Sequence, residues 1–311
     1  MSVENNAIIT EYANCLFEQP WWLNLVTDNW EEILVKNDKE EIIARAPIAV
    51  SGKSVVRPHL TQNIGVWMRQ DIVSDYSAQK NAISEIEEKI KKYKSVDRSL
   101  APENKYVLPY RWHDYRIEPR FTYRISDLSD MDALYQSFNK TAKKNIKYAR
   151  NKVSLRYDTN VDVLIDMLDK TYEAQKRRNP VSGELVKRIV EYCDKTGHGK
   201  YIDAVDEMGN VHSCAYFVYD EKVCYYLLGA SDSTYRNSGA QSLILWEGIQ
   251  FASGVSRAFD FEGSMVEGIE HFFKQFGGEC IPYYCVSRKG IFSELMDILK
   301  PRIKRLIGYK L

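Results

Sequence analysis

Residues 259–278 read FDFEGSMVEGIEHFFKQFGG and govern the interpretation of the whole chain. The first five residues alternate aromatic and acidic side chains and end at a glycine. This pattern predicts a short strand with Asp260 and Glu262 on one face. A polar turn follows, and then a helix that carries several aromatic residues and Lys274. Open α/β sheets bind ligands outside the carboxyl ends of their strands, so these charged residues are predicted to lie near a ligand site.

Length and composition describe an ordinary globular protein of one large or two moderate domains. The chain has 311 residues, of which 44% are hydrophobic and 28% are charged. Its 43 basic and 43 acidic residues cancel, which argues against a strongly basic nucleic-acid binder but leaves a local basic patch open. No signal-peptide pattern opens the chain, and no apolar stretch approaches the roughly 20 residues that span a bilayer. A cytoplasmic protein without a membrane span is expected.

Cysteine and histidine residues show no metal-binding pattern. The six cysteines are scattered without a C-x-x-C pair, and the five histidines have no H-E-x-x-H spacing. Reduced and mostly buried thiols are expected, and no metal site is predicted.

The order of predicted elements is a mixed α/β order. In the first half, helices are expected near 17–26 and 77–94, and strands at 30–36, 41–52, 106–108 and 115–125. In the second half, the expected elements are a helix from Ser129 to about 149, helices near 161–172 and 184–196, strands at 200–206, 211–220 and 222–230, a helix at 240–254, a strand at 256–263, a helix at 266–276, a strand at 279–288 and a helix at about 292–306. The sheet should be antiparallel early and parallel near 257–262. The fold class is therefore α/β, with structurally similar halves at 1–120 and 121–311.

Two further groups of residues could bind a substrate. Lys143, Lys147 and Arg150 recur at i, i+4 and i+7 and form one basic helical face, which could hold phosphates of a nucleotide-linked or lipid-linked acceptor or an RNA backbone. A solvated helix face is the simpler interpretation. Trp67 follows a polar loop and could line an acceptor cleft, although structural packing is the favoured interpretation.

Four segments resemble the GNAT acyltransferase superfamily, and more narrowly its branch of Fem peptidoglycan-bridge aminoacyltransferases. They are FEQPWWLNLV, NKTAKKNIKYARNK, YRNSGAQSLILWEGIQFA and FDFEGSMVEGIEHFFKQFGG. The resemblance reaches across most of the chain, and the last segment is the most specific. It implies two GNAT-like halves, each a mixed sheet flanked by helices. The first half would be degenerate and would form a wall of the acceptor cleft.

The resemblance also implies a donor site at the turn that precedes the helix at 240–254. The GNAT pattern Q/R-x-x-G-x-G/A falls on Arg236, Asn237, Ser238, Gly239, Ala240 and Gln241. Backbone N–H groups of such a turn could hold the phosphates of the donor. Gln241 departs from the pattern, because a small residue is usual there.

The resemblance implies an N-acyltransferase that moves an acyl group from a phosphate-rich donor to an amine. Asp260 or Glu262 would take the proton from the amine, and Lys274 would stabilise the oxyanion or hold a donor phosphate. Fem enzymes that use aminoacyl-tRNA often carry a coiled-coil insertion, which this chain lacks, so acyl-CoA is favoured as co-substrate. The acceptor could be a cell-envelope or polysaccharide precursor. Two alternatives stay open: an aminoacyl-tRNA-dependent transferase acting on a peptidoglycan precursor, and a non-catalytic ligand-binding protein.

Overall fold

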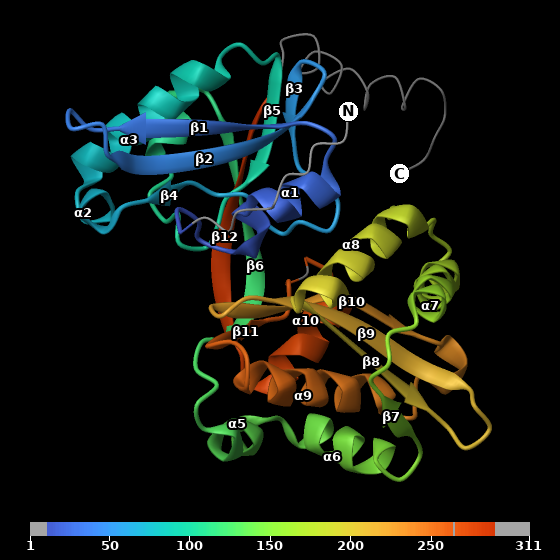
Figure 1. Ribbon diagram of the computed structural model, residues 1–311. Helices are drawn as coiled ribbons and strands as arrows, with labels where there is room; N and C mark the ends of the chain where they lie inside the picture. Colours follow the sequence, from blue (N-terminus) through green and yellow to red (C-terminus); the bar gives the residue numbers. More distant parts are fainter. Residues whose placement is uncertain (1–10, 264, 290–311) are drawn as a thin grey trace, which may run out of the picture. The chain divides into compact units, whose positions relative to one another are not determined.

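The computed structural model describes residues 11–263 and 265–289 and divides the chain into two compact units (Figure 1). Unit 1 comprises Met1–Pro119 and Tyr283–Leu311, and unit 2 comprises Arg120–Pro282. The α/β fold class is confirmed, because each unit contains a mixed sheet with helices packed on it. The end of the last described strand, placed in the second half on the sequence, groups with unit 1. The helix expected at about 292–306 lies outside the described residues.

Unit 1 has the strand order β1-β2-β3-β5-β12, and β4 pairs with β2. The pairing of β3 with β5 is parallel, and the other pairs are antiparallel. Helix α3 packs on β1 and β2 over the apolar residues that predicted it. The described elements that begin in unit 1 are η1 (Leu16–Glu18), α1 (Pro20–Val26), β1 (Trp30–Lys36), β2 (Ile42–Ser51), β3 (Ser54–Val56), β4 (Trp67–Met68), α2 (Gln70–Val73), α3 (Tyr76–Ile90), β5 (Ser95–Ser99), α4 (Leu108–Trp112) and β6 (Arg116–Ile125).

Unit 2 has the strand order β6-β11-β10-β9-β8-β7, in which only the pairing of β10 with β11 is parallel among the described ladders. Helix α9 packs against β8 to β11 and against α6, while α7 contacts β9 and β10 and α8 contacts β8. The elements are α5 (Met131–Ser137), α6 (Lys140–Ala149), β7 (Ser154–Arg156), α7 (Val161–Ala174), α8 (Gly183–Thr196), β8 (Gly199–Val205), β9 (Val211–Tyr219), β10 (Val223–Ser231), η2 (Ser233–Tyr235), α9 (Ala240–Ser253), β11 (Ala258–Asp260), α10 (Glu267–Phe273), η3 (Lys274–Phe276) and β12 (Glu279–Arg288).

Two predicted elements are wrong in detail. Residues 106–108 do not form a strand; α4 begins at Leu108 with Pro109 in its first turn, a position that proline favours. The apolar stripe expected to form one helix from Ser129 to about 149 is divided into α5 and α6. The division occurs because the Asn139 side chain accepts a hydrogen bond from the Thr141 N–H and starts a new helix.

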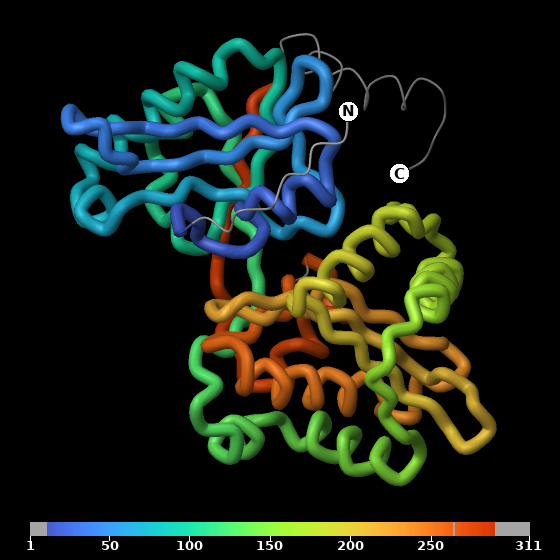
Figure 2. The backbone as a smooth tube through the Cα atoms, viewed as in Figure 1, coloured from blue at the N-terminus to red at the C-terminus, as the bar shows by residue number. Residues whose placement is uncertain are grey.

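The chain runs consecutively through β10, α9, β11 and α10 (Figure 2). Two parallel strands, β10 and β11, are joined by α9, so their carboxyl ends lie at the same edge. The core beneath them is aromatic and includes Phe217, Phe259, Phe261 and Phe273. The ligand site predicted from the sequence refers to this edge of the sheet and stays a prediction.

Candidate acyl-transfer site

Asp260, the last residue of β11, is a fully buried carboxylate held by three donors. The Thr122 hydroxyl donates to its Oδ1 at 2.6 Å, and the Arg124 Nε donates to its Oδ2 at 2.9 Å. The backbone N–H of Glu262 donates to Oδ1 at 2.7 Å. A buried carboxylate needs such partners, and here they fix the end of β11 against β6. Asp260 therefore forms a structural ion pair with Arg124, and it also positions Glu262 by accepting a hydrogen bond from its backbone N–H.

Glu262 lies in a different environment from Asp260. The strand ends at Asp260, and Glu262 lies beyond it with φ +60°, so the alternation that placed both carboxylates on one strand face does not reach Glu262. Its Oε1 is shielded from solvent and has no hydrogen-bond partner among the described residues. Burial, and secondarily the charge of Asp260, raises the pKa of Glu262 well above its ordinary value. A carboxyl group with a raised pKa is a candidate for proton transfer with a substrate.

Lys274 is not brought next to these carboxylates. Its Nζ lies 3.3 Å from Glu270 Oε2, and Glu270 Oε1 accepts a hydrogen bond from the Tyr123 hydroxyl at 2.5 Å. The hydrogen bond from Tyr123 lowers the pKa of Glu270. Tyr123 stands between Thr122 and Arg124 on β6, and successive side chains of a strand point to opposite faces. Lys274 is therefore linked to the sheet face opposite Asp260.

Thr122, Tyr123, Arg124 and Glu270 were not predicted from the sequence as site residues. Thr122 and Arg124 lie 138 and 136 residues from Asp260 along the chain. The sequence does contain one signal for Arg124, because an arginine inside a predicted strand is rarely buried without an acidic partner. The sequence could not name that partner.

The predicted donor turn ends at the N-terminus of α9. Gly239 is the N-cap residue of that helix and has φ +75°. A Cβ at this position would lie 2.5 Å from the backbone oxygen of Asn145 in α6, so only glycine permits this close approach. Ser238 Oγ accepts a hydrogen bond from the Ala240 N–H at 3.3 Å, while Arg236 and Asn237 are exposed. The start of α9 thus offers backbone N–H groups and exposed polar side chains to an anion.

Gln241 turns its side chain inward. Its Oε1 accepts a hydrogen bond from the Ser231 hydroxyl at 2.5 Å and one from Ser213, and its Nε2 donates to the Tyr226 hydroxyl. The residue that departs from the GNAT pattern is thus bound to β9 and β10 rather than presented at the surface of the turn.

The pairing between β10 and β11 ends next to this cluster. They pair only over Val223–Tyr225 and Ala258–Asp260, although β10 continues to Ser231. At the same point, the register between β10 and β9 shifts between Tyr225 and Leu228, which marks a β-bulge. Bulges re-aim side chains and often lie next to active sites.

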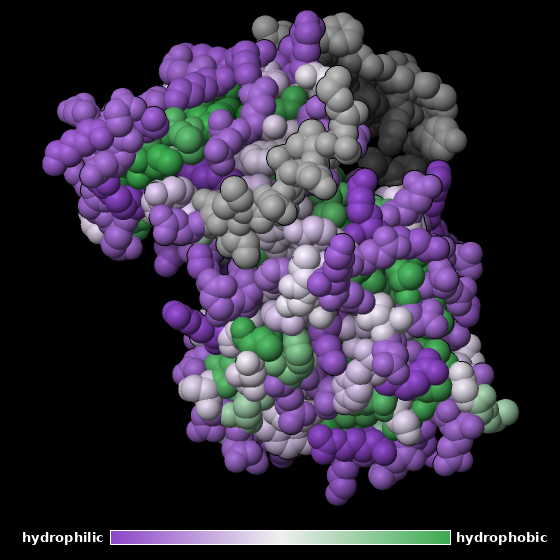
Figure 3. All heavy atoms as spheres, viewed as in Figure 1, coloured by the Kyte–Doolittle hydropathy of each residue, from purple (hydrophilic) through white to green (hydrophobic). Residues whose placement is uncertain are grey.

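The basic face of α6 lies beside the start of α9. Lys143 donates from Nζ to the Gln136 carbonyl at 2.7 Å and lies over the Tyr135 ring. Four further cations on α6 and its C-cap are exposed and make no ion pair with any described residue: Lys140, Lys144, Lys147 and Arg150. Hydrophilic side chains cover this helix at the lower edge of the view in Figure 3. The helix therefore presents a cationic surface whose charge the neighbouring described residues do not neutralise.

Residues 136–274 match the family model described as an acetyltransferase (GNAT) domain. This part of the chain is similar to GNAT acetyltransferase domains. The resemblance inferred from sequence is thereby confirmed for the segment that holds α6, the turn before α9, β11 and α10. No sequence among the curated proteins matches the chain.

Solved structures extend the likeness to both units of the chain. The structure titled FemX shares 13% identity, covers 91% of this chain and 94% of its own, and has a TM-score of 0.66. L-PGS from Bacillus licheniformis shares 14% identity at 90% coverage of both chains, with a TM-score of 0.52. A tandem GNAT protein from the clavulanic acid biosynthesis pathway shares 9% identity, covers 83% of this chain and 82% of its own, and has a TM-score of 0.51. These similarities establish the fold that the chain shares with Fem-like proteins.

Trp67 lies outside the GNAT domain, in β4 of unit 1. It pairs with Arg45 of β2, and its ring packs on Tyr12 with centroids 4.9 Å apart. The ring is partly buried, and these contacts account for its position as packing within unit 1. Its predicted role at an acceptor cleft stays a prediction.

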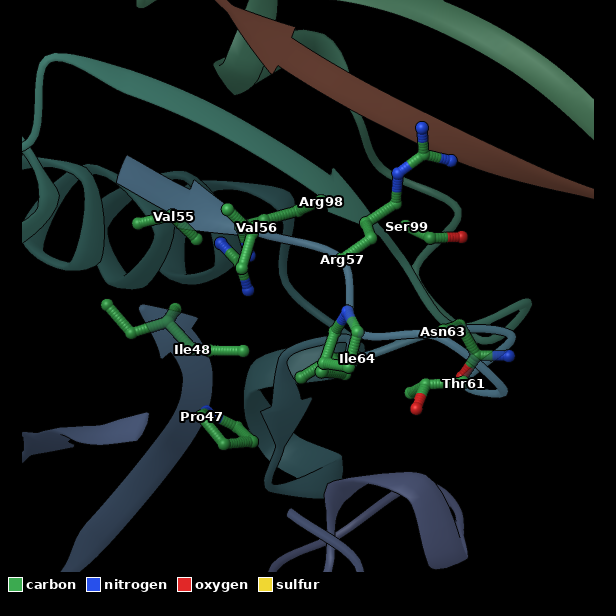
Figure 4. Close-up of a pocket in the computed structure, with 12 residues that line it drawn as sticks. Pro47, Ile48, Val55, Val56, Arg57, Thr61, Asn63, Ile64, Arg98 and Ser99 are labelled. Carbon is green, nitrogen blue, oxygen red and sulfur yellow. The ribbon is translucent and has the colours of Figure 1, made fainter. Parts of the chain in front are cut away.

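Unit 1 contains a small cavity between β2, β3 and β5 (Figure 4). Its volume is about 10 Å³, which is room for one water molecule at most. Arg57 directs its guanidinium away from Pro47 and Ile48, and donates to Cys285 Sγ at 3.5 Å. Such a cavity cannot hold an acyl donor.

Among residues 11–263 and 265–289, no helix is long and apolar enough to cross a membrane. Within the same ranges, no group of three or more His, Cys, Asp or Glu side chains could hold a metal ion. None of the six cysteines forms a disulfide, and all but Cys280 are buried.

Proposed function

We propose that this chain is an N-acyltransferase whose reaction centre is the carboxyl end of β11. The observation that carries the proposal is Glu262: a shielded carboxyl oxygen without a described partner and a raised pKa, within a GNAT domain. A structural carboxylate would be expected to have partners, as Asp260 does. An unpartnered one at a ligand-binding edge supports a role with a substrate proton.

In the proposed reaction, the nitrogen of an acceptor amine attacks the acyl carbonyl of the donor. The amine proton passes to Glu262, the new amide bond forms, and the ester or thioester bond of the donor breaks. The leaving oxygen or sulfur takes up a proton. We propose that backbone N–H groups at the bulge of β10 stabilise the oxyanion. Lys274, bound to Glu270 on the other sheet face, is proposed to contact the donor rather than the amine.

The donor is proposed to bind through phosphates at the turn that contains Arg236 and Gly239. Acyl-CoA is the donor that the sequence favours. The basic face of α6 supports aminoacyl-tRNA as the second candidate, because its exposed cations extend over about 15 Å of helix. A row of unpaired cations of that length suits a phosphate backbone better than a single diphosphate. The acceptor is proposed to be an amine on a cell-envelope or polysaccharide precursor.

The decisive experiment supplies the purified full chain with two donor classes and a panel of amine acceptors. The donors are acetyl-CoA and longer acyl-CoAs in one series, and tRNAs charged with different amino acids in the other. Mass spectrometry measures the amide product, and uncharged tRNA and free CoA serve as controls. Transfer from one series that is lost in the Glu262→Gln variant would support the proposal and name the donor.

If neither donor series gave an amide product while the chain still bound a donor, the proposal would be contradicted. Charge-neutral changes at Asp260, Glu262 and Lys274 would then leave the biological activity of a folded protein intact. That outcome would favour the non-catalytic ligand-binding alternative.

A further inference from the structure

Tyr226 is the first residue of β10 beyond its pairing with β11. Its ring packs against Phe217 and Phe273, with centroids 5.6 Å and 5.9 Å apart. It runs along β10 so closely that a Cβ on Gly229 would overlap its hydroxyl. The bulge at this point of β10 re-aims the side chain along the strand. Tyr226 therefore occupies the space between β10, α9 and α10.

A hydrogen-bond cluster holds the tyrosine in this position. Its hydroxyl accepts a hydrogen bond from Gln241 Nε2 in the first turn of α9. The Gln241 amide is fixed in turn, because its Oε1 accepts hydrogen bonds from Ser231 and Ser213. All four residues are buried or half-buried, where satisfied polar networks are rigid. Gln241 thus holds the Tyr226 side chain in place through this hydrogen bond.

Gln241 stands in the first turn of α9, where the donor phosphates are proposed to bind, and from there it holds Tyr226. In the proposed function, donor phosphates bind at the start of α9, and the acyl carbon must reach Glu262 beyond β11. In parallel sheets, a ligand takes this route through the crevice outside the carboxyl ends of neighbouring strands. Acyl-CoA carries its acyl group on a long thin arm that would have to enter this crevice. Here the Tyr226 ring packs between β10, α9 and α10, next to the end of the pairing between β10 and β11.

We propose that Tyr226, held by Gln241, closes the crevice between β10 and β11 and selects against donors whose acyl group is carried on a long thioester arm. The inference rests on the proposed function and deepens it by naming the residues that set donor specificity. A small residue at position 241 leaves the Tyr226 hydroxyl without its donor and frees the ring to rotate. An acyl-CoA can then bind without breaking the hydrogen bond between Gln241 and Tyr226.

The test is calorimetric titration of the full chain with acetyl-CoA. Three variants are compared with the wild type. Gln241→Ala removes the hydrogen bond to Tyr226, Tyr226→Phe removes only the hydroxyl, and Tyr226→Ala removes the ring. Tyr157→Phe is the matched control, since its hydroxyl bonds Glu247 at 2.7 Å elsewhere in unit 2. We expect acetyl-CoA to bind at least tenfold more tightly to Gln241→Ala and Tyr226→Ala than to the wild type. Tyr226→Phe should fall between, and Tyr157→Phe should match the wild type.

Three results would overturn the inference, each in variants whose circular dichroism shows a folded protein. Micromolar wild-type binding that Gln241→Ala weakens would make Gln241 a donor ligand. Equal affinity in all variants, or no acetyl-CoA binding by any of them, would show that the ring does not control entry. None of these results touches the proposed function, which is tested separately by amide formation and its loss in Glu262→Gln.

Discussion

At the scale of single residues, Asp260 and Glu262 show how two nearby carboxyl groups acquire different properties. Asp260 has three donors and is fully buried. Glu262 has a shielded oxygen without a described partner, and burial raises its pKa. Environments that separate the behaviour of two carboxyl groups in this way commonly assign them different tasks. We therefore expect only Glu262 to exchange a proton with the substrate.

The first prediction concerns the rate of amide formation by Glu262→Gln. We expect kcat/KM to fall by about 10² to 10⁴-fold, the usual contribution of a general base. In the wild type, kcat/KM should rise with pH through a pKa well above 4.5, because the base must lose its proton. The exposed Glu267 on α10 provides the control Glu267→Gln, which should keep the wild-type profile. An unchanged rate in Glu262→Gln would exclude this residue as the base.

The second prediction separates the two carboxyl groups by stability. Asp260→Asn leaves Arg124 without its ionic partner and should lower the free energy of unfolding by about 3 to 5 kcal/mol. The raised pKa of Glu262 means that the folded state binds the proton more tightly than the unfolded state. Stability therefore falls as pH rises from 4.5 towards the folded pKa, and Glu262→Gln removes this loss. Urea titrations of the wild type and both variants at pH 5 and pH 8 measure the difference; a destabilised Glu262→Gln at pH 8 would contradict it.

At the scale of elements, the start of α9 depends on its contact with α6. The third prediction is that Gly239→Ala destabilises unit 2 by on the order of 2 to 4 kcal/mol, since a Cβ combines a strained φ of +75° with overlap on Asn145. Gly209→Ala is the matched control, because its φ is +86° but no heavy atom lies within 4 Å of the added Cβ. Chemical denaturation should show a loss for Gly209→Ala of about 1 kcal/mol. Equal losses in both variants would mean that the α6 contact is unimportant.

The fourth prediction concerns the basic face of α6 in binding charged tRNA. Replacing Lys144, Lys147 and Arg150 by alanine should weaken binding and reduce the slope of log affinity against log salt by about three. Lys195→Ala, an exposed lysine on α8, should leave both quantities unchanged. Fluorescence anisotropy between 50 and 300 mM salt measures the slopes. A triple variant with the wild-type slope would show that α6 is only a solvated helix face.

At the scale of the whole molecule, the described core clusters draw on residues that lie far apart in the sequence. The described core cluster of unit 1 runs from Ile33 to Tyr115 and then takes Val286 from β12. The cluster of unit 2 draws on residues from Ile125 to Phe276. Because β12 pairs with β5, unit 1 is complete only when the strand after unit 2 has been added.

The fifth prediction uses Val286, which is fully buried and pairs with Arg98. Val286→Asp places a charge in the unit 1 core and should increase amide hydrogen exchange in β2 and β5. Exchange in β9 and α9 should stay slow, since unit 2 has its own core. Ser287→Asp, on the other face of the strand, is the control and should have a smaller effect. Loss of protection in both units together would show that they unfold as one.

Much of the fold could be predicted from local patterns. Apolar periodicity located α3, α7, α8 and α9, and the meander of β8 to β10 followed from alternation and turn residues. Short elements such as β3, β5 and β7 were not predicted, because three to five residues carry little periodicity. The break at Asn139 was missed because the apolar stripe continues through it, and only the capping side chain interrupts the backbone.

The sequence by itself determined the α/β class, the carboxylates at the end of the 259–263 segment, the turn before α9 and the basic face of α6. Each rests on neighbours within a few residues, where periodicity and spacing act. Only the tertiary structure decided that Asp260 is bound to Thr122 and Arg124, that Lys274 belongs with Tyr123 and Glu270, and that Gln241 holds Tyr226. Most of these contacts join residues more than a hundred positions apart, and only strand pairing and helix packing in the folded chain bring them together. Burial and hydrogen bonding then give Asp260 and Glu262 different properties, although the two carboxyl groups look equivalent in the sequence.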